Sequence, residues 1–200
     1  MSQTTSYQDP AATLYQGDSL DVLAELAPES VHCVGIKMGY ADPPYVGQAK
    51  RHYSEQPDYV GEVNHAALIQ RLMDEFSDGW ALSCSSPSLR YLLGLCPSEV
   101  RIGAWVKPFA SFKPGVGVAY ACEPVIFYGG RPISRDKDTV RDWVSCNITL
   151  TRGIHGAKPD AFCYWLFQVL NLKANDEFCD LYPGSGAVTR AWEKWKGRLL

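Results

Sequence analysis

The stretch "DEFCDLYPGSGAVTRAWEKW", residues 176–195, decides the fold class. Its first part, residues 176–182, is an apolar run of strand length that contains Asp180, and the turn residues "PGSG" follow directly. The remainder, from Ala187 onward, predicts a helix. A strand, a glycine turn and a helix in immediate succession are typical of α/β proteins, in which ligands bind at the carboxyl ends of strands. The motif alone fits an ordinary structural corner equally well.

Strand-like and helix-like segments alternate along the rest of the chain. Apolar runs predict strands at residues 13–16, 31–36, 80–84, 100–109 and 123–130, and a last strand that begins at residue 198. Apolar residues at helical spacing predict helices at residues 17–26, 64–76, 87–96 and 158–170. This alternation is typical of an α/β sheet with helices on both faces. The length of 200 residues favours one domain, residues 1–200, in which residues 131–156 are the least regular stretch.

The composition limits the classes of protein to which the chain belongs. Hydrophobic residues make up 46% of the sequence, and the net charge is −3 with a pI near 5.8. A binding site for a polyanion therefore has to be a local patch. The candidate nucleic-acid-binding residues are Lys50, Arg51, His52, Arg131, Arg135, Arg141 and Arg152.

The cysteines, the histidines and the N-terminal sequence point to an intracellular protein without a metal. The seven cysteines form no C-x-x-C pair and the four histidines show no ligand spacing, so we expect no metal site. Cysteines scattered through apolar stretches fit a reducing compartment. The start "MSQTTSYQDP" lacks the layout of a signal peptide, and no apolar run approaches the roughly 20 residues of a membrane span. We expect a cytoplasmic location and no membrane partner.

A second motif lies in "YADPPYVGQAKRHY", residues 40–53, behind a predicted strand. Two consecutive prolines cannot continue a helix or lie in a central strand, so they hold the backbone beside Asp42 rigid. A rigid carboxylate with rigid neighbouring carbonyls suits an exocyclic amino group, which offers two N–H donors and no charge. Tyr45 offers a flat face for a planar base. From the residues alone, the alternative is a Pro-Pro loop with a half-buried tyrosine.

Together these motifs resemble those of the S-adenosylmethionine-dependent amino-methyltransferases of DNA. "DPPY" at residues 42–45 is similar to the catalytic motif of that family, and "DLYPGSG" at residues 180–186 is similar to its cofactor motif. "GAKPDAFCYWLF" at residues 156–167 resembles the motif that precedes the cofactor motif. The catalytic motif comes first in the chain, so the order is circularly permuted, as in the β-type enzymes. The sequence is most similar to short members from phages and prophages.

The resemblance implies a Rossmann-like methyltransferase fold and methyl transfer from S-adenosylmethionine to the N6 amino group of adenine in DNA. It implies that Asp42, Pro43, Pro44 and Tyr45 are catalytic. Asp42 and the Pro43 carbonyl would accept hydrogen bonds from the target amino group, and Tyr45 would stack on an extruded base. The implied cofactor-binding residues are Asp18, Lys158, Pro159, Asp180, Tyr182, Gly184, Ser185 and Gly186. The chemistry needs no metal, and the adenine has to be flipped out of a duplex or single-stranded.

The sequence leaves several alternatives open. The family's long target-recognition region is reduced here to a short basic insertion, residues 131–156, which implies low sequence specificity, or a homodimer or second specificity subunit. The ribose-binding acid of the family would follow Leu200, so a catalytically weak or inactive DNA-binding protein or subunit is an alternative. Cytosine N4, RNA and a free nucleotide are alternative substrates. We expect the protein in the cytoplasm of a bacterial host of a phage or prophage.

Overall fold

The computed structural model describes residues 6–9, 12–15, 35–50, 54, 61–109, 114–149 and 157–199. The chain divides into two compact units, residues 1–34 and residues 35–200, and each is described by itself. The predicted site residues Asp18, Arg51, His52 and Arg152 lie outside the described residues, as does the predicted helix at residues 17–26. The assignment of the whole chain to one methyltransferase domain stays a prediction.

The first unit contains an antiparallel pair of short strands. The strand β1 is Ser6–Asp9 and the strand β2 is Ala12–Tyr15, and Ser6 lies opposite Tyr15 in their register. The strand predicted at residues 13–16 corresponds to β2, whereas β1 was not predicted.

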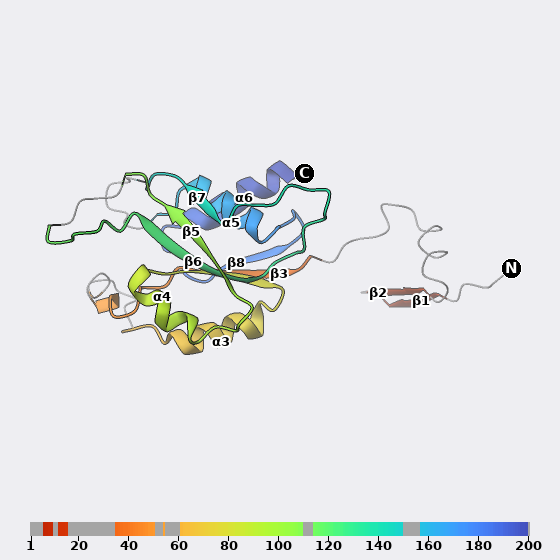
Figure 1. Cartoon of the computed structure of the whole chain (residues 1–200). Coiled ribbons are helices and arrows are strands. Elements are labelled where there is room, and N and C mark those ends of the chain that lie inside the picture. The colour runs from red at the N-terminus through yellow and green to blue at the C-terminus, as the bar shows by residue number, and fades with distance from the viewer. Residues whose placement is uncertain are drawn as a thin grey trace. The chain divides into compact units, whose positions relative to one another are not determined.

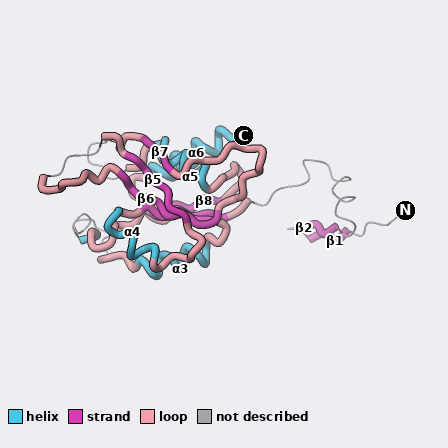
Figure 2. The backbone as a smooth tube through the Cα atoms, in the orientation of Figure 1, coloured by secondary structure: helices cyan, strands magenta, loops and turns pink. Residues whose placement is uncertain are grey.

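The second unit is built around a six-stranded mixed sheet, drawn in magenta in Figure 2. Its strands are β3 (Lys37–Ala41), β4 (Gly79–Ser83), β5 (Arg101–Val106), β6 (Cys122–Gly129), β7 (Trp143–Ser145) and β8 (Glu177–Asp180). Their order is β7-β5-β6-β4-β3-β8. β3 is parallel to both its neighbours, and only β6 runs against the others. We call the side of the sheet where β3, β4, β5 and β8 end its carboxyl end, and the opposite side its amino end.

Helices flank the sheet on both faces, as predicted. They are α3 (His65–Glu75), α4 (Ser86–Leu93), α5 (Asp160–Val169) and α6 (Ala187–Leu199). The side chain of Asn64 caps α3 by accepting from the Ala67 N–H at 3.1 Å, and Pro87 falls in the first turn of α4. Figure 1 shows α3 and α4 together on one face and α5 and α6 on the other.

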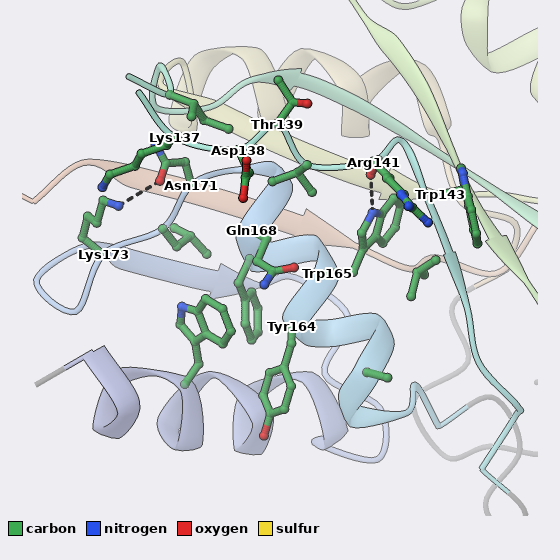
Figure 3. A pocket seen from close by; sticks show the side chains of 17 residues that line it. Lys137, Asp138, Thr139, Arg141, Trp143, Tyr164, Trp165, Gln168, Asn171 and Lys173 are labelled. Atoms are coloured by element: carbon green, nitrogen blue, oxygen red, sulfur yellow. Dashed lines mark hydrogen bonds between the residues drawn. The ribbon is translucent and has the colours of Figure 1, made fainter. Parts of the chain in front are cut away.

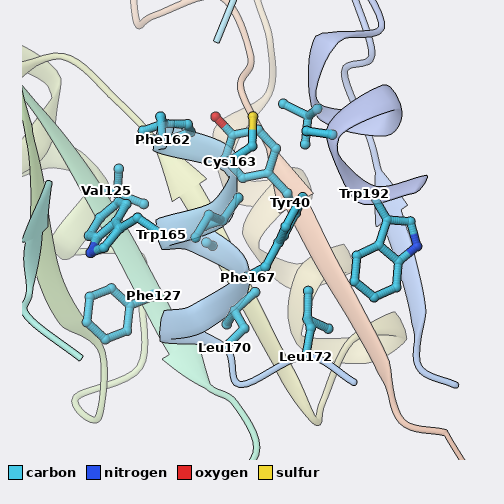
Figure 4. Close-up of a cluster of buried hydrophobic side chains, with 14 of the residues drawn as sticks. Tyr40, Val125, Phe127, Phe162, Cys163, Trp165, Phe167, Leu170, Leu172 and Trp192 are labelled. Atoms are coloured by element: carbon cyan, nitrogen blue, oxygen red, sulfur yellow. The ribbon is translucent and has the colours of Figure 1, made fainter. Parts of the chain in front are cut away.

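The alternation of side chains along the strands produces two hydrophobic cores, one on each face of the sheet. On one face, Tyr40 of β3 packs with Phe162 and Phe167 of α5, all with no exposed surface (Figure 4). On the other face, Trp80 of β4 packs with Leu72 of α3. Because aromatic side chains bury a large apolar area each, these cores fix the strands whose ends carry the two motifs.

Two strand predictions are wrong in position. The strand before the DPPY motif is β3, which begins at Lys37, so Gly35 and Ile36 of the predicted strand 31–36 precede it. Residues 31–34 lie outside the described residues. The strand predicted from residue 198 does not form, because α6 continues to Leu199. Val188, Ala191 and Trp192 bury one stripe of this helix in the core with α5, which keeps the segment helical. The strand β7 was not predicted.

No helix in the described ranges is long and apolar enough to cross a membrane. Within the same ranges, no group of three or more His, Cys, Asp or Glu side chains could hold a metal ion. The described cysteines are free thiols, and Cys84 and Cys163 are buried.

Candidate active site

The two sequence motifs lie side by side at the carboxyl end of the sheet. β3 leads directly into Asp42, and the neighbouring strand β8 ends at Asp180. The register pairs Tyr40 with Asp180, and the Leu181 N–H donates to the Tyr40 carbonyl at 2.9 Å. Because the two strands are parallel, segments that are far apart in the sequence reach the same place. This is where α/β folds bind ligands.

Asp42 stands at the end of a chain of four charged side chains. Its carboxylate lies 2.8 Å from the Lys158 ammonium, which also lies 2.7 Å from one oxygen of Glu123. The other oxygen of Glu123 lies 2.6 Å from the Lys107 ammonium. The side chains of Lys158 and Glu123 are each 5% exposed, whereas that of Asp42 is 22% exposed. Asp42 is therefore the member of the central acid–lysine–acid group that solvent, or a ligand, can reach.

The structure adds two residues to the site and changes the surroundings of a third. Lys158 was assigned to the cofactor, and its ammonium is buried between the carboxylates of Asp42 and Glu123. Glu123 and Lys107 were not predicted. The available signal was an acid, Glu123, in the otherwise apolar strand β6, because a buried carboxylate needs a cationic partner.

Burial and charge set the protonation states in this group. Burial raises the pKa of Asp42, and the Lys158 ammonium partly opposes that rise. Burial alone would raise the pKa of Glu123, but the ammonium groups of Lys158 and Lys107 outweigh it and lower that pKa. Burial would lower the pKa of Lys158, but the two carboxylates outweigh it and raise that pKa. Lys158 thus stays protonated and Glu123 stays ionised. As the pH falls, Asp42 is the acid of this group that takes up a proton first.

The Pro-Pro loop is held from both sides. The Tyr45 hydroxyl donates to the Glu123 carboxylate, and burial, with the nearby carboxylates of Glu123 and Asp42, raises the pKa of Tyr45. The Tyr45 carbonyl accepts from the Gln48 N–H at 2.8 Å in a turn. The His65 ring approaches the carbonyl oxygens of Val63 and Pro44, with its Nδ1 3.0 Å from the former. Asp42 and Tyr45 are therefore placed by contacts on several elements.

Asp180 has an unsatisfied oxygen beside the glycine turn. Its Oδ1 is buried and has no hydrogen-bond partner among the described residues, whereas its Oδ2 accepts from the Thr189 hydroxyl at 3.3 Å. Burial raises the pKa of Asp180 to about 6. The turn that follows has positive φ at Gly184 (44°) and Gly186 (70°), a conformation that favours glycine. A buried carboxylate oxygen without a partner is rare in proteins and indicates a ligand or a functional role.

The remaining residues of the predicted cofactor site lie around this turn or at the neighbouring helix. Pro159 is the N-cap residue of α5, next to Lys158. Tyr182 is half-buried and packs against the core on the α3 side of the sheet. The Ser185 carbonyl accepts from the Arg190 guanidinium at 2.8 Å.

The described basic residues of the predicted nucleic-acid site are spread over the molecule. Lys50 is exposed, five residues beyond Tyr45, and its backbone N–H donates to Glu62 at 3.3 Å. Arg131 lies at the amino end of the sheet, where its guanidinium is 2.5 Å from the buried Asp176. Arg135 is exposed in a turn. The structure therefore does not bring Arg131 to the carboxyl end of the sheet.

Arg141 lies at a pocket that is separate from the two motifs. The pocket has a volume of about 560 Å³ and lies between residues 133–144 and α5 (Figure 3). Its lining includes Trp143, Tyr164 and Gln168, and the Trp165 indole N–H donates to the Arg141 carbonyl at 2.8 Å. None of the predicted catalytic or cofactor residues that the structure describes lines it.

Comparisons with known proteins support the fold. A scan against protein-family models found no match for the sequence, and a search of curated proteins found none. Among solved structures, the complex of M1.HpyAVI with SAM is 14% identical, covers 90% of this chain and 87% of its own, and has a TM-score of 0.52. M1.HpyAVI alone is 12% identical. The match covers 82% of this chain and 77% of that protein, with a TM-score of 0.53. The chain has the fold of M1.HpyAVI, and the predicted α/β sheet with helices on both faces is confirmed.

Proposed function

We propose that the protein transfers a methyl group from S-adenosylmethionine to the exocyclic N6 amino group of adenine in DNA. The observation that supports this most is the pair of carboxylates at the ends of the neighbouring parallel strands β3 and β8. Asp180 has a buried oxygen that finds no partner in the described part of the chain, which suits a cationic or hydroxyl-bearing ligand. Asp42 is held in place by a buried lysine and its side chain is 22% exposed, which suits an amino group that approaches from outside.

The residues at the end of β8 fit S-adenosylmethionine. Its methionine part carries an ammonium group, which complements the ionised form of Asp180. A Cβ atom at Gly184 would meet nothing closer than the Tyr182 carbonyl oxygen at 3.8 Å, so the glycine leaves its backbone open to a ligand. The start of α6 supplies N–H groups directly after the turn. The complex of M1.HpyAVI with SAM supports the choice of cofactor.

The residues of this chain act on the acceptor side of the reaction. Bound S-adenosylmethionine supplies an electrophilic methyl group on a sulfonium sulfur. The lone pair of an adenine amino group is delocalised into the ring, so the nitrogen is a poor nucleophile. Asp42 and the Pro43 carbonyl accept hydrogen bonds from the two N–H groups of the amino nitrogen. These contacts favour a tetrahedral, more nucleophilic nitrogen. As the N–C bond forms and the C–S bond breaks, the nitrogen releases one proton, which the ionised Asp42 accepts.

Adenine in DNA is the proposed substrate because Asp42 heads the DPPY motif and Tyr45 offers a stacking face beside it. The base has to leave the duplex, or be single-stranded, to reach Asp42. We also propose low sequence specificity. Reading several base pairs needs side chains on an element that enters the major groove. In the described part of the basic insertion, β7 joins the sheet and Arg131 is tied to Asp176, which leaves little chain for such an element.

The proposal is tested by cofactor binding followed by product analysis. Titration calorimetry with S-adenosylmethionine and with its demethylated product should show binding of both. Incubation with DNA and the cofactor, digestion to nucleosides and mass spectrometry should then show N6-methyladenine in many sequence contexts. N4-methylcytosine as the sole product would contradict the adenine assignment. Cofactor and DNA binding without any methylated product would favour an inactive DNA-binding protein of the same fold.

The variant Asp42→Ala should abolish most of the methyl transfer and leave cofactor binding unchanged. Asp42 contacts the target amino group in the proposal, so its loss affects the chemical step, commonly by a factor of about a hundred or more. The matched control is Asp74→Ala, which removes an exposed aspartate of α3 that accepts from Gln70 on its own helix. Equal turnover of Asp42→Ala and wild type would show that Asp42 has another role.

A further inference from the structure

Glu123 contacts three side chains that surround Asp42. Its carboxylate lies 2.7 Å from the Lys158 ammonium and 2.6 Å from the Lys107 ammonium, and it accepts the Tyr45 hydroxyl. It comes from β6, the strand next to β4 and two places from β3. A carboxylate oxygen can accept more than one hydrogen bond, so three donors on two oxygens satisfy a buried acid. Glu123 is therefore the common partner of the groups that border the proposed target base.

Aromatic rings restrict where the two ammonium groups can lie. The Lys158 ammonium is 5.5 Å from the centre of the Trp105 ring and 5.7 Å from that of Phe162. The Lys107 ammonium is 4.4 Å from the centre of the Trp105 ring. Cations over aromatic faces are attracted by the ring quadrupole. The two ammonium groups thus lie between aromatic rings on one side and the Glu123 carboxylate on the other.

We propose that Glu123 is a positioning residue of the methyl-transfer site, which holds Lys158 against Asp42 and orients the ring of Tyr45. This inference rests on the proposed function. Glu123 acts through its neighbours, since Lys158 stands between it and Asp42. Lys158 contacts one oxygen of Asp42, Oδ2, which leaves lone pairs on the carboxylate for the target amino group.

In this position Glu123 also shares the charge of the Lys158 ammonium with Asp42. Two acids and two lysines make a neutral group, and removal of the Glu123 charge leaves one acid with the buried Lys158 and the partly buried Lys107. Asp42 then carries the whole interaction with Lys158, which competes with the target amino group. The titratable groups that face Asp42 are Lys158, Glu123, Lys107, Asp180, Tyr40, Tyr45 and Cys84. Among them, the Glu123 carboxylate raises the pKa of Asp42, so its neutralisation should lower that pKa.

The test is the variant Glu123→Gln, which keeps the size of the side chain and removes its charge. We expect unchanged affinity for S-adenosylmethionine, a kcat lowered about tenfold to a hundredfold, and an acid limb of the kcat profile that moves to lower pH. The control is Glu177→Gln, which removes an exposed glutamate that pairs with Lys37 at 3.8 Å. A kcat and an acid limb equal to those of wild type would overturn the inference.

A second readout does not depend on activity. Carbon NMR of carboxyl-labelled aspartate, with Asp42 assigned from the spectrum of Asp42→Asn, should show a lower pKa for Asp42 in Glu123→Gln than in wild type. An unchanged pKa would overturn the inference even if the proposed function is correct. If wild-type protein transfers no methyl group but the pKa shift is present, the proposed function fails and the link between Glu123 and Asp42 stands.

Loss of stability is separated from loss of positioning by a second variant. Glu123→Gln takes one carboxylate partner from the buried Lys158 and from the partly buried Lys107, which can unfold the protein. The double variant Lys107→Met with Glu123→Gln removes one cation and one anion together and should recover stability in denaturant titrations. Its kcat should stay low, because Lys158 and Tyr45 still lack the carboxylate. Recovery of wild-type kcat would show that charge balance alone matters and would contradict the positioning role.

Discussion

The two ends of the same sheet each hold a buried acid, and the acids differ in how completely they are satisfied. At the amino end, the Asp176 side chain has no exposed surface. It accepts from the backbone N–H groups of Ile36 at 3.1 Å and Lys173 at 2.7 Å, and from the Arg131 guanidinium at 2.5 Å. These contacts join the segments before β3, after α5 and after β6. An acid with all its partners inside the protein stabilises the fold.

At the carboxyl end, the acids of the two sequence motifs, Asp42 and Asp180, have incomplete or adjustable partners. Asp180 keeps one buried oxygen without a partner among the described residues, and burial raises its pKa to about 6. Asp42 is partly exposed, and burial raises its pKa against the effect of Lys158. A raised pKa means that the ionised form of the acid is less stable in the protein than in water. Acids of this kind at strand ends are typical of functional sites. The comparison separates a structural acid from functional acids within one sheet.

The largest effect that tests this comparison is on stability at the amino end. Asp176→Ala leaves Arg131 without its carboxylate and two backbone N–H groups without an acceptor, so the free energy of unfolding should fall by about 3–5 kcal/mol. Chemical denaturation followed by tryptophan fluorescence measures it. The methyl-transfer rate per folded molecule should stay at the wild-type value.

The matched control is Asp160→Ala. Asp160 pairs with Lys194 at 2.9 Å, but both side chains are more than half exposed, so its loss should cost about 1 kcal/mol or less. Equal stability losses in Asp160→Ala and Asp176→Ala would remove the distinction between the amino-end acid and an ordinary surface acid.

The sequence predicted the elements whose periodicity is strong. The stripe of Ile69, Leu72, Met73 and Phe76 identified α3, and the apolar runs identified β4, β5, β6 and β8. The sequence also placed Asp42 and Asp180 each at the end of a strand, and they meet because these strands are parallel and end on the same side of the sheet. The weakest signals were short or unusual segments. β7 has only three residues. β3 contains Gly39, where a Cβ atom would lie 2.8 Å from the Phe76 ring, so close packing and not strand propensity selects the residue there.

The partners of charged side chains could not be predicted. Lys158 and Glu123 meet because β6 is inserted next to β4 and runs against it, and local patterns do not encode this order of strands. The same limit applies to Arg131. Its place in a basic stretch suggested nucleic-acid binding, and its ion pair with Asp176 depends on the path of a distant loop. Composition reports charge, whereas the role of a charge depends on what the fold places beside it.

The next effect concerns Asp180 and pH. The pKa of Asp180 is raised to about 6, so its carboxylate is ionised above that pH and becomes neutral as the pH falls through it. Only the ionised form complements an ammonium group. The affinity for S-adenosylmethionine should therefore be constant above about pH 7, weaken as the pH falls through about 6, and level off at a loss of about tenfold once Asp180 is neutral.

Calorimetry across this pH range measures the effect. Asp180→Asn should bind the cofactor about tenfold more weakly at pH 8, because a hydrogen bond to a charged group is lost, and its affinity should not change between pH 5 and 7. An affinity that depends on pH equally in wild type and in Asp180→Asn would show that another group titrates. The unpartnered oxygen of Asp180 would then lose its functional interpretation.

The smallest effect concerns which part of the molecule meets DNA. Lys50 follows the DPPY motif and is exposed, whereas Arg135 lies in an exposed turn within the basic insertion. If DNA binds over the carboxyl end, Lys50→Glu should weaken binding to all sequences alike and lower the slope of log affinity against log salt concentration by about one unit. Fluorescence anisotropy with two unrelated duplexes at several salt concentrations measures both quantities. Arg135→Glu makes the same change of charge in the other segment. A slope that falls with Arg135→Glu and not with Lys50→Glu would place the DNA contact away from Asp42. A base of the bound duplex could then not reach Asp42, and the proposed target site would be wrong.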